Sequence, residues 1–525
     1  MKLSRIMDAL RKDGRDNPVA VPGAPDREIS GVSASSRKVE PGFVFVAIPG
    51  TAADGHDFIP DAVSRGASAV ILERAVELPP GVVAIRVKSS RRALAAVSAC
   101  WFGDPSRSLK VVGITGTNGK TTVSYFLEAV LAAAGFSTGV VGTVNCRYNG
   151  QVFETGVTTP DSWELQEILA CMRDAGVTHV VMEVSSHALV QDRVRRVSFD
   201  CALFTNLTQD HLDFHKDMES YGAAKALFFT DYAADNGEKA MYAVINRDDA
   251  FGDSLCRLAR CKVVTTGLAG GRDIFGSDVA ISPEGLSGRV RSPLGEVFIH
   301  SDMAGLHNFR NILSVAGAAH CLGIPPALVK KGIEGLSRVP GRLDRVKNDL
   351  CRNVFVDYAH SPDALMNVLS ALRACGAGRI ITVMGCGGDR DRKKRPLMGE
   401  AAARLSDLLV VTSDNPRSED PDAIIAEILP GVTPLLPALS AEDLRAAEPA
   451  AGFFVEPARE KAIEAAVLAS RPGDTLLIAG KGHENYQIIG KAKRHFDDRE
   501  QAAAALALIA ARQDGQCSSR PGRRP

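Results

Sequence analysis

The sequence predicts an α/β protein of three domains, in which a central phosphate-loop NTPase-like domain with a parallel sheet precedes a doubly wound, Rossmann-like domain. Three observations support this prediction. The chain has 525 residues, more than one hydrophobic core usually supports. A glycine-rich turn near residue 116 stands between an apolar strand and a helix. Beyond residue 340, apolar strands alternate with helical segments, as in a parallel sheet covered by helices.

The first domain is expected over residues 1–90, where short strands dominate. Its apolar runs of strand length lie at 43–47, 69–72 and 82–85. A helical segment over 91–102 and a Gly-Asp-Pro-Ser turn then lead into the second domain, expected over residues 91–338. The strands predicted within this second domain lie at 110–114, 180–183 and 202–204.

The third domain is expected over residues 339–512, after a break at Val339-Pro340-Gly341. Its predicted strands lie at 354–356, 380–383, 408–411, 453–455 and 476–478. Because helical segments separate most of these strands, the sequence predicts a doubly wound sheet. The final residues, 513–525, are rich in Gly, Ser, Arg and Pro and are expected to form a disordered tail.

Composition argues against several classes of function. The 62 basic residues balance the 62 acidic ones, so no overall charge favours nucleic acid or an anionic membrane surface. No apolar run approaches the roughly 20 residues that span a bilayer, and the charged N-terminus lacks a signal-peptide core. The 11 cysteines show no metal-binding spacing and are expected to be reduced thiols. We therefore expect a cytoplasmic, monomeric enzyme that acts on small molecules, without membrane insertion.

The most informative segment is the glycine-rich turn, which reads Gly116-Thr117-Asn118-Gly119-Lys120-Thr121-Thr122. Glycines allow backbone N–H groups to surround a phosphate, the following helix and the lysine add positive charge, and Thr121 offers Mg²⁺ an oxygen. The strict spacing of a phosphate loop is not met, because Ile114 stands where its first glycine would be. The strand before the turn and the helix after it still favour nucleoside triphosphate binding over a chance glycine-lysine turn.

Polar clusters follow four predicted strands of the third domain. They begin at Asp357, Gly385, Ser413 and Gly480. Ligands of open parallel sheets bind at the carboxyl ends of the strands, so we expect the four clusters to share one edge of the sheet. Any one of them could be an ordinary polar loop. The four together favour a binding site.

These motifs resemble those of the Mur ligase family over nearly the whole chain. Besides the phosphate loop, the matching segments are residues 183–189, 206–213, 307–311, 341–342 and 357–360. The segment Asp414-Asn415-Pro416-Arg417 resembles the signature of members that add meso-diaminopimelate, and lysine-adding members differ there. The resemblance therefore implies an ATP-dependent amide ligase that adds meso-diaminopimelate to UDP-N-acetylmuramoyl-L-alanyl-D-glutamate in peptidoglycan synthesis.

The implied reaction has two steps. ATP phosphorylates the D-glutamate side chain to an acyl phosphate, and the amine of the incoming amino acid then attacks. Positioning and charge neutralisation dominate the catalysis of phosphoryl transfer, and Lys120 and Arg342 suit that role. The resemblance also places the adenosine against Asn308 and Asp357.

By the same resemblance, Thr121 and Glu183 would hold one Mg²⁺, and His211, also counted among the catalytic residues, would help to hold a second. A lone carboxylate or histidine at such a position is more often structural. Lys225 matches a lysine that these ligases carbamylate, which turns a cation into an anionic metal ligand with a catalytic role. Its place on a probable helix over 221–229 would otherwise indicate a solvated surface lysine. Carbamylation needs a neutral amine, so we expect burial to depress the pKa of Lys225.

The nucleotide-sugar substrate is expected at the first domain and at its seam with the second. The stretch 31–37 resembles a uridine-contacting segment, although Ser35 stands where aspartate is common, and Val157 stands where relatives can carry asparagine. The resemblance assigns the substrate to Ser36, Thr51, Ala52, Ala53, Thr158, Thr159, Ser185, Gln191 and Arg193. A serine or threonine cluster alone would indicate only a turn.

The amino-acid substrate is expected at the strand ends of the third domain. Compared with lysine, meso-diaminopimelate has an additional distal carboxylate, which the guanidinium of Arg417 can bind through two parallel N–H groups. The implied contacts are Arg390, Asp414, Asn415, Pro416, Arg417, Gly480 and Glu484, with the two acidic side chains facing the distal ammonium. Without the other motifs, 414–417 would indicate a local turn in which Asp414 caps Arg417.

Two other functions compete with this one. Folylpolyglutamate synthetase shares the phosphate loop and the ligase chemistry, but it does not account for the 414–417 segment or the first domain. A nucleotide-gated scaffold would hydrolyse ATP without forming an amide.

Overall fold

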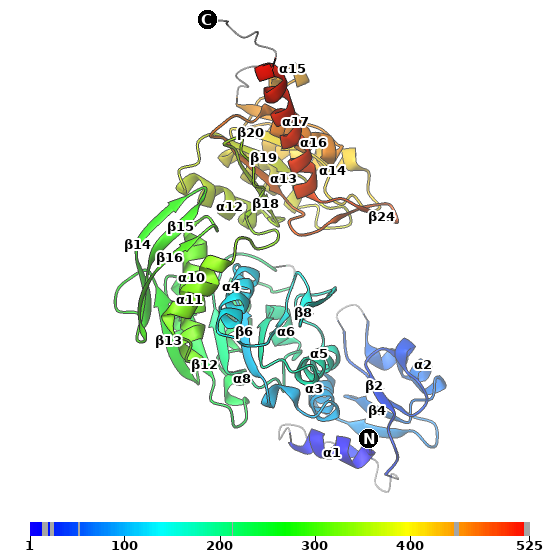
Figure 1. Ribbon diagram of the computed structural model, residues 1–525. Helices are drawn as coiled ribbons and strands as arrows, with labels where there is room; N and C mark the ends of the chain where they lie inside the picture. The colour runs from blue at the N-terminus through cyan, green and yellow to red at the C-terminus, as the bar shows by residue number, and fades with distance from the viewer. Residues whose placement is uncertain (13–18, 21–25, 51–52, 213, 446–450, 519–525) are drawn as a thin grey trace, which may run out of the picture.

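The computed structural model describes residues 1–12, 19–20, 26–50, 53–212, 214–445 and 451–518. Three domains follow one another along the chain, from the N-terminal lobe at the lower right to the C-terminal lobe at the top (Figure 1). The predicted α/β architecture with three domains is confirmed.

The first domain is a five-stranded sheet in the order β1-β5-β4-β3-β2, parallel except for β1. Buried side chains of α3 join those of α1 in its core, so the predicted boundary at residue 90 falls at the start of a helix that packs on this domain. Its elements are α1 (Leu3–Lys12), β1 (Val19–Ala20), β2 (Gly31–Ser33), η1 (Ser36–Lys38), β3 (Phe43–Val46), η2 (Gly55–Phe58), α2 (Ile59–Ser64), β4 (Ala69–Leu72), β5 (Val83–Arg86) and α3 (Ser90–Trp101).

The second domain has an eleven-stranded sheet in the order β16-β15-β14-β13-β12-β11-β6-β10-β7-β8-β9. Its centre is parallel, and antiparallel strands extend both ends. Its elements up to β11 are η3 (Pro105–Arg107), β6 (Lys110–Thr115), α4 (Lys120–Ala133), β7 (Thr138–Val141), β8 (Cys146–Tyr148), β9 (Gln151–Phe153), α5 (Ser162–Asp174), β10 (His179–Glu183), α6 (Ser186–Val190) and β11 (Cys201–Phe204).

Helices from both halves of this domain cover the two faces of the sheet. Helices α4, α10 and α11 pack on one face, and α5 and α6 on the other. The elements after β11 are α7 (Met218–Ala226), α8 (Asp231–Ala234), β12 (Tyr242–Asn246), α9 (Ala250–Leu258), β13 (Lys262–Gly267), β14 (Ile274–Ser282), β15 (Gly285–Ser292), β16 (Gly295–Ser301), α10 (Leu306–Cys321) and α11 (Pro326–Gly335).

The third domain is doubly wound around a six-stranded sheet in the order β17-β18-β22-β19-β20-β21. Helices α12, α13 and α14 cover one face, and α16 and α17 the other. Its elements are β17 (Asp344–Arg345), β18 (Asn353–Asp357), α12 (Pro362–Ala374), β19 (Ile380–Met384), α13 (Lys394–Leu405), β20 (Leu408–Val411), α14 (Pro421–Val432), α15 (Ala441–Arg445), β21 (Gly452–Val455), α16 (Arg459–Ala469), β22 (Thr475–Ala479), β23 (Tyr486–Ile489), β24 (Ala492–His495) and α17 (Asp498–Ser518).

The C-terminal end differs from the prediction in one respect. Helix α17 continues to Ser518, past the predicted start of the disordered tail at residue 513, and residues 519–525 lie outside the described part of the chain. Among the described helices, none is both long and apolar enough to cross a membrane.

The phosphate-loop helix α4 depends on a close approach by α11. A Cβ on Gly332 would lie 2.5 Å from the Cα of Val130, so the glycine lets the two backbones meet. We predict that Gly332→Ala lowers the free energy of unfolding by about 1–3 kcal/mol, because the helices must separate. Urea denaturation measures the change. Gly335→Ala in the same helix meets nothing within 4 Å and is the matched control; an equal loss of stability in both variants would contradict the packing argument.

Candidate active site

A cleft of about 710 Å³ lies between the second and third domains. The second domain contributes the phosphate loop, the end of β10 and the start of α10, and the third contributes the end of β18 and a face of α12. Of the residues predicted from the sequence, those that line the cleft are Thr117, Asn118, Gly119, Lys120, Thr121, Thr122, Thr158, Glu183, His211, Asn308, Arg342 and Asp357.

The phosphate loop follows β6 and ends where α4 begins at Lys120. Gly116 has a φ of +147°, and a Cβ there would lie 1.9 Å from Thr205 Oγ1, so only glycine fits. The Nζ of Lys120 donates to the carbonyls of Gly116 and Thr117, each at 2.9 Å. Desolvation between the domains lowers the pKa of Lys120. The loop therefore presents free helical N–H groups and a lysine to the cleft.

Hard oxygen ligands gather next to the phosphate loop. Glu183, at the end of β10, is 1% exposed and accepts hydrogen bonds from Thr121 Oγ1 at 3.2 Å and from Thr143 Oγ1 at 2.8 Å. A carboxylate and two hydroxyls suit Mg²⁺. In the described part of the chain, no three His, Cys, Asp or Glu side chains lie close enough to hold a metal by themselves. The donor set thus fits an ion that is completed by phosphate oxygens and water.

His211 lies farther along the same cleft. Its φ of +55° is in the left-handed region, which a non-glycine residue adopts only when its surroundings impose it. Its Nε2 is 3.5 Å from Asp210 Oδ2, and its ring lies 5.0 Å from that of His187. The imidazole is 42% exposed and can reach a bound ligand.

Arg342 connects the two domains at the cleft. Its Nη2 donates to Thr121 Oγ1 at 3.2 Å, and its guanidinium lies 5.3 Å from the ring centre of Tyr358. Its Nε is buried and has no hydrogen-bond partner among the described residues. Asp357, whose pKa is raised by burial, accepts from the backbone N–H of Leu343 at 2.7 Å and thereby fixes this segment. The third domain thus places a cation beside the phosphate loop.

Asn308 also lines the cleft, in the first turn of α10. Its Nδ2 donates to the carbonyl of Ala304 at 2.7 Å, and its Oδ1 accepts from Asn311 at 3.1 Å. The amide is therefore fixed in one orientation at the cleft wall.

A second pocket, of about 270 Å³, lies at the seam of the first and second domains. Gln191 and Arg193 line it together with Ile48 and Arg91. The guanidinium of Arg193 donates to Gln191 Oε1 at 3.0 and 2.7 Å, which holds both side chains in place.

The other residues predicted for the nucleotide-sugar substrate are dispersed. Thr159 Oγ1 donates to the carbonyl of Glu183, and Ser185 caps α6. Both residues therefore stabilise the backbone next to Glu183 at the cleft wall. Ser36 on η1 and Ala53 do not line either of these pockets. Thr51 and Ala52 lie outside the described residues.

The four polar clusters of the third domain share one sheet edge, as predicted, because β18, β22, β19 and β20 are parallel neighbours. Asp414 is buried, and its Oδ1 has no hydrogen-bond partner among the described residues. A Cβ on Gly480 would lie 2.9 Å from Asp414 Oδ2, so the strand ends approach closely. Glu484 Oε2 accepts from Asn415 Nδ2 at 2.9 Å. Two carboxylates thus stand at this edge.

Two arginines lie at the same edge. A Cβ on Gly387 would be 3.0 Å from Arg417 Nη1 and 3.7 Å from Arg390 Cγ, so both arginines flank one glycine. Arg417 has a φ of +51°, and its Nη1 donates to the carbonyl of Gly388 at 2.7 Å. It is half-buried, and Arg390 is exposed. The local alternative, in which Asp414 caps Arg417, does not occur; Asp414 faces Gly480 instead.

The carboxylate and arginine cluster adjoins the cleft between the second and third domains through Tyr358. The Tyr358 ring lies 4.8 Å from that of His483, the residue before Glu484, and the guanidinium of Arg342 lies 5.3 Å from its centre. A Cβ on Gly341 would lie 2.4 Å from the backbone nitrogen of His483. These contacts make one continuous wall from the phosphate loop to the polar strand ends.

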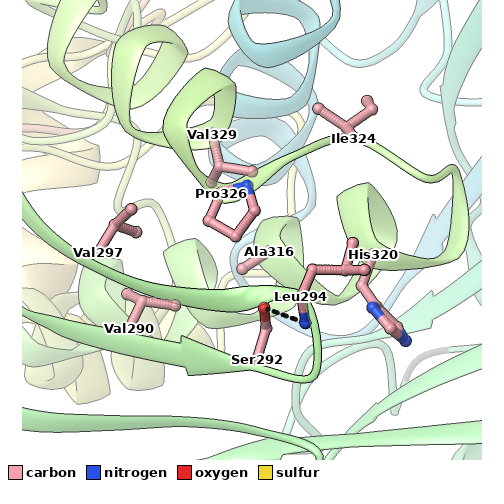
Figure 2. Close-up of a pocket in the computed structure, with 9 residues that line it drawn as sticks. All are labelled: Val290, Ser292, Leu294, Val297, Ala316, His320, Ile324, Pro326 and Val329. Atoms are coloured by element: carbon pink, nitrogen blue, oxygen red, sulfur yellow. Dashed lines mark hydrogen bonds between the residues drawn. The ribbon is translucent and has the colours of Figure 1, made fainter.

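Another hollow, between the β15–β16 hairpin and helices α10 and α11, is unrelated to this wall. Figure 2 shows its largely apolar lining, with Ser292 Oγ accepting from the backbone of Leu294. It encloses about 10 Å³, space for at most one water molecule.

Comparison with known proteins gives the same order of domains. Residues 28–103 match the profile described as Mur ligase family, catalytic domain; residues 114–319 match Mur ligase middle domain; and residues 341–482 match Mur ligase, glutamate ligase domain. The chain belongs to the Mur ligase family. Like other members, it is an ATP-dependent ligase.

Individual relatives of this Mur ligase match it almost end to end. A protein of Geobacter metallireducens named UDP-N-acetylmuramoyl-L-alanyl-D-glutamate--2,6-diaminopimelate ligase is 48% identical over 95% of this chain and 98% of its own. A protein of the same name from Geobacter sulfurreducens is 48% identical over 96% and 98%. A solved structure with that name superposes with a TM-score of 0.65 at 30% identity, over 92% of this chain and 96% of its own.

Lys225 of this Mur ligase is buried beneath the cleft and does not line it. Its side chain lies on α7 at 1% exposure, with Nζ 4.3 Å from the ring centre of Tyr221. Tyr221 Oη in turn lies 3.3 Å from Thr117 Oγ1 of the phosphate loop. Burial, and then the nearby charge of Lys120, lower the pKa of Lys225 well below its usual range. The alternative of a solvated surface lysine is therefore wrong, and the expected lowering of the Lys225 pKa by burial is present.

Two functional candidates were missed by sequence reasoning. Thr143 binds Glu183 through both its backbone and its hydroxyl, and no motif marks it. Lys481 is wholly buried among the carboxylates, with Nζ 3.5 Å from Glu484 Oε2 and 4.0 Å from Asp414 Oδ1. Its position inside the Gly-Lys-Gly-His-Glu cluster was the available signal.

Proposed function

We propose that this Mur ligase adds meso-diaminopimelate to UDP-N-acetylmuramoyl-L-alanyl-D-glutamate, with cleavage of ATP to ADP and phosphate, as a cytoplasmic monomer in peptidoglycan synthesis. The observation that supports it most strongly is the presence of two arginines, Arg417 and Arg390, at the same sheet edge as the carboxylates of Asp414 and Glu484. Arginines complement the distal carboxylate, and the acids complement the distal ammonium. The names of full-length relatives support the same substrates.

In the first step, the D-glutamate carboxylate attacks the terminal phosphorus of ATP and ADP leaves. Lys120 and Arg342 both contact the phosphate loop and would offset the negative charge that concentrates there. We assign Mg²⁺ to Thr121, Glu183 and His211, and to Lys225 once it is carbamylated. The ion would supply further charge neutralisation at the phosphates.

In the second step, the amine of diaminopimelate attacks the acyl carbon, the C–O bond to phosphate breaks, and the amine loses a proton. The main contribution of the protein is to position the two reactants, because the amino-acid pocket and the phosphate loop share the wall formed by Arg342 and Tyr358. The muramoyl peptide is assigned to Thr158 in the cleft and to Gln191 and Arg193 in the second pocket. The nucleotide end is assigned to the first domain.

The choice of amino acid tests the proposed function. With lysine as substrate, Arg417 and Arg390 would lack a carboxylate. Unpaired charges of this kind cost about 2–5 kcal/mol when buried, and half-burial of Arg417 places the cost near 2 kcal/mol, or roughly 30-fold. We expect amide formation and ADP release to need both the UDP-muramoyl dipeptide and diaminopimelate, with kcat/KM for lysine lower by at least that factor. ATP hydrolysis indifferent to both substrates would instead support the scaffold alternative, and amide formation on a folate would support the synthetase alternative.

Arg417 has a specific predicted effect. Arg417→Ala removes the donor for the distal carboxylate and should raise KM for diaminopimelate about 30-fold or more, with KM for ATP within about twofold of the unmodified enzyme. Steady-state kinetics with each substrate varied in turn measure both. Arg404→Ala, on the exposed surface of α13, is the control. Equal increases in the two KM values would contradict the assignment.

Lys225 is predicted to act as an anion. Lys225→Ala should abolish ligation, bicarbonate should not restore it, and a short carboxylic acid such as formate should restore part of it by replacing the carbamate. The initial rate of ADP formation with all substrates present is the measurement. Lys331→Ala, an exposed lysine on α11, is the control. A fully active Lys225→Ala variant would remove the residue from the mechanism.

A further inference from the structure

A buried ion pair lies directly behind the amino-acid pocket. Arg459 and Asp498 are the first residues of α16 and α17, and both side chains are 0% exposed. The guanidinium donates from Nε to Asp498 Oδ1 at 2.8 Å and from Nη2 to Oδ2 at 2.7 Å. The pair is thus bidentate and fully removed from water.

The same guanidinium also binds two backbone carbonyls at the pocket edge. Nη1 donates to the carbonyl of Ser413 at 3.3 Å, and Nη2 to the carbonyl of Ala479 at 3.0 Å. These carbonyls immediately precede Asp414 and Gly480. Since β19 separates β20 from β22 in the sheet, one side chain spans the end of the intervening strand and joins the two loops.

Stability alone does not account for an ion pair at this place. Replacement of a buried ion pair by well-packed apolar residues is often neutral or stabilising. An apolar pair could replace the ion pair at this place, because the other contacts of α16 and α17 are made by apolar side chains such as alanine, leucine and isoleucine. An apolar pair, however, cannot donate hydrogen bonds to the two carbonyls.

We propose that Arg459, held by Asp498, is a positioning residue of the diaminopimelate pocket: it fixes the Ser413 and Ala479 carbonyls so that the Asp414 carboxylate and the Gly480 backbone face the substrate. The inference rests on the proposed function. The spacing it maintains is tight, because a Cβ on Gly480 would already lie 2.9 Å from Asp414 Oδ2. A displacement of a few tenths of an ångström therefore alters the contact.

Arg459 also places a positive charge near Asp414. Burial raises the pKa of Asp414; Arg459, followed by Lys481, opposes that rise, and the charges of Glu484 and Asp498 add to it. The Oδ1 atom of Asp414 is buried and has no protein hydrogen-bond partner among the described residues. A substrate ammonium would satisfy it.

The opposite edge of the sheet provides a matched control. Arg379, just before β19, donates from Nε at 3.1 Å and from Nη2 at 2.7 Å to Asp474 Oδ2, and Nη2 also donates to the carbonyl of Ala469 at 2.7 Å. It is an arginine-aspartate pair with a carbonyl contact in the same domain. It lies at the amino ends of the strands, away from the pocket.

Arg459→Lys and Arg379→Lys, made in the full-length enzyme, test the proposal. Arg459→Lys keeps the charge but cannot donate hydrogen bonds to both carbonyls. We therefore expect KM for diaminopimelate to rise about tenfold, while KM for ATP and KM for the UDP-muramoyl dipeptide stay within about twofold of their values in the unmodified enzyme. Arg379→Lys should lower the melting temperature about as much as Arg459→Lys does, but it should leave all three KM values unchanged. An unchanged KM for diaminopimelate in Arg459→Lys, or equal increases in all three, would overturn the proposal.

The double variant Arg459→Met/Asp498→Leu serves if Arg459→Lys does not fold. It replaces the whole pair by apolar side chains, which buried sites tolerate, and should show the same selective rise in KM. Diaminopimelate kinetics like those of the unmodified enzyme would overturn the proposal. If the unmodified enzyme forms no amide with diaminopimelate, the proposed function fails and this inference fails with it; if it does form the amide and the Arg459 variants keep its KM, the inference alone fails.

Discussion

The contact between Arg342 and Thr121 is the interaction on which the site depends. Thr121 belongs to the phosphate loop of the second domain, and Arg342 belongs to the segment that leads into the third. A hydrogen bond at 3.2 Å between them sets the distance between the domains at the position that we propose for the ATP phosphates. Because the arginine also lies against Tyr358, the same side chain fixes where the proposed amino-acid pocket begins.

Parallel sheet topology explains why the two halves of the site meet. In the second domain, the phosphate loop and Glu183 follow the adjacent parallel strands β6 and β10. In the third domain, Asp357, Gly480, Gly385 and the Ser413 cluster follow adjacent parallel strands in the same way. Each sheet therefore presents its polar residues at the carboxyl edge. The cleft forms where the two edges face each other across the Gly341–Arg342 segment.

Most of the fold could be predicted from the sequence, because strand runs such as 408–411 are uniformly apolar and buried on both faces. The β14–β16 strands could not, since their burial alternates and their glycines and serines weaken the strand pattern. The phosphate loop could be located because its chemistry is local. The ring of Tyr221 lies one turn away from Lys225 on the same helix, so that contact is local. The burial of Lys225 and its proximity to the charge of Lys120 could not be derived from the helix, because both arise only through tertiary packing. Arg459 lies 46 and 20 residues from its two carbonyl partners in the sequence and gave no signal at all.

The central claim is that one continuous site extends from Lys120 to Arg417. A crystal structure of the enzyme with a non-hydrolysable ATP analogue and meso-diaminopimelate tests it most directly. We predict the terminal phosphate beside Lys120 and Arg342, the distal carboxylate of the amino acid on Arg417, and its reacting amine directed toward that phosphate. Diaminopimelate bound away from Arg417, or with its amine directed out of the cleft, would contradict the account.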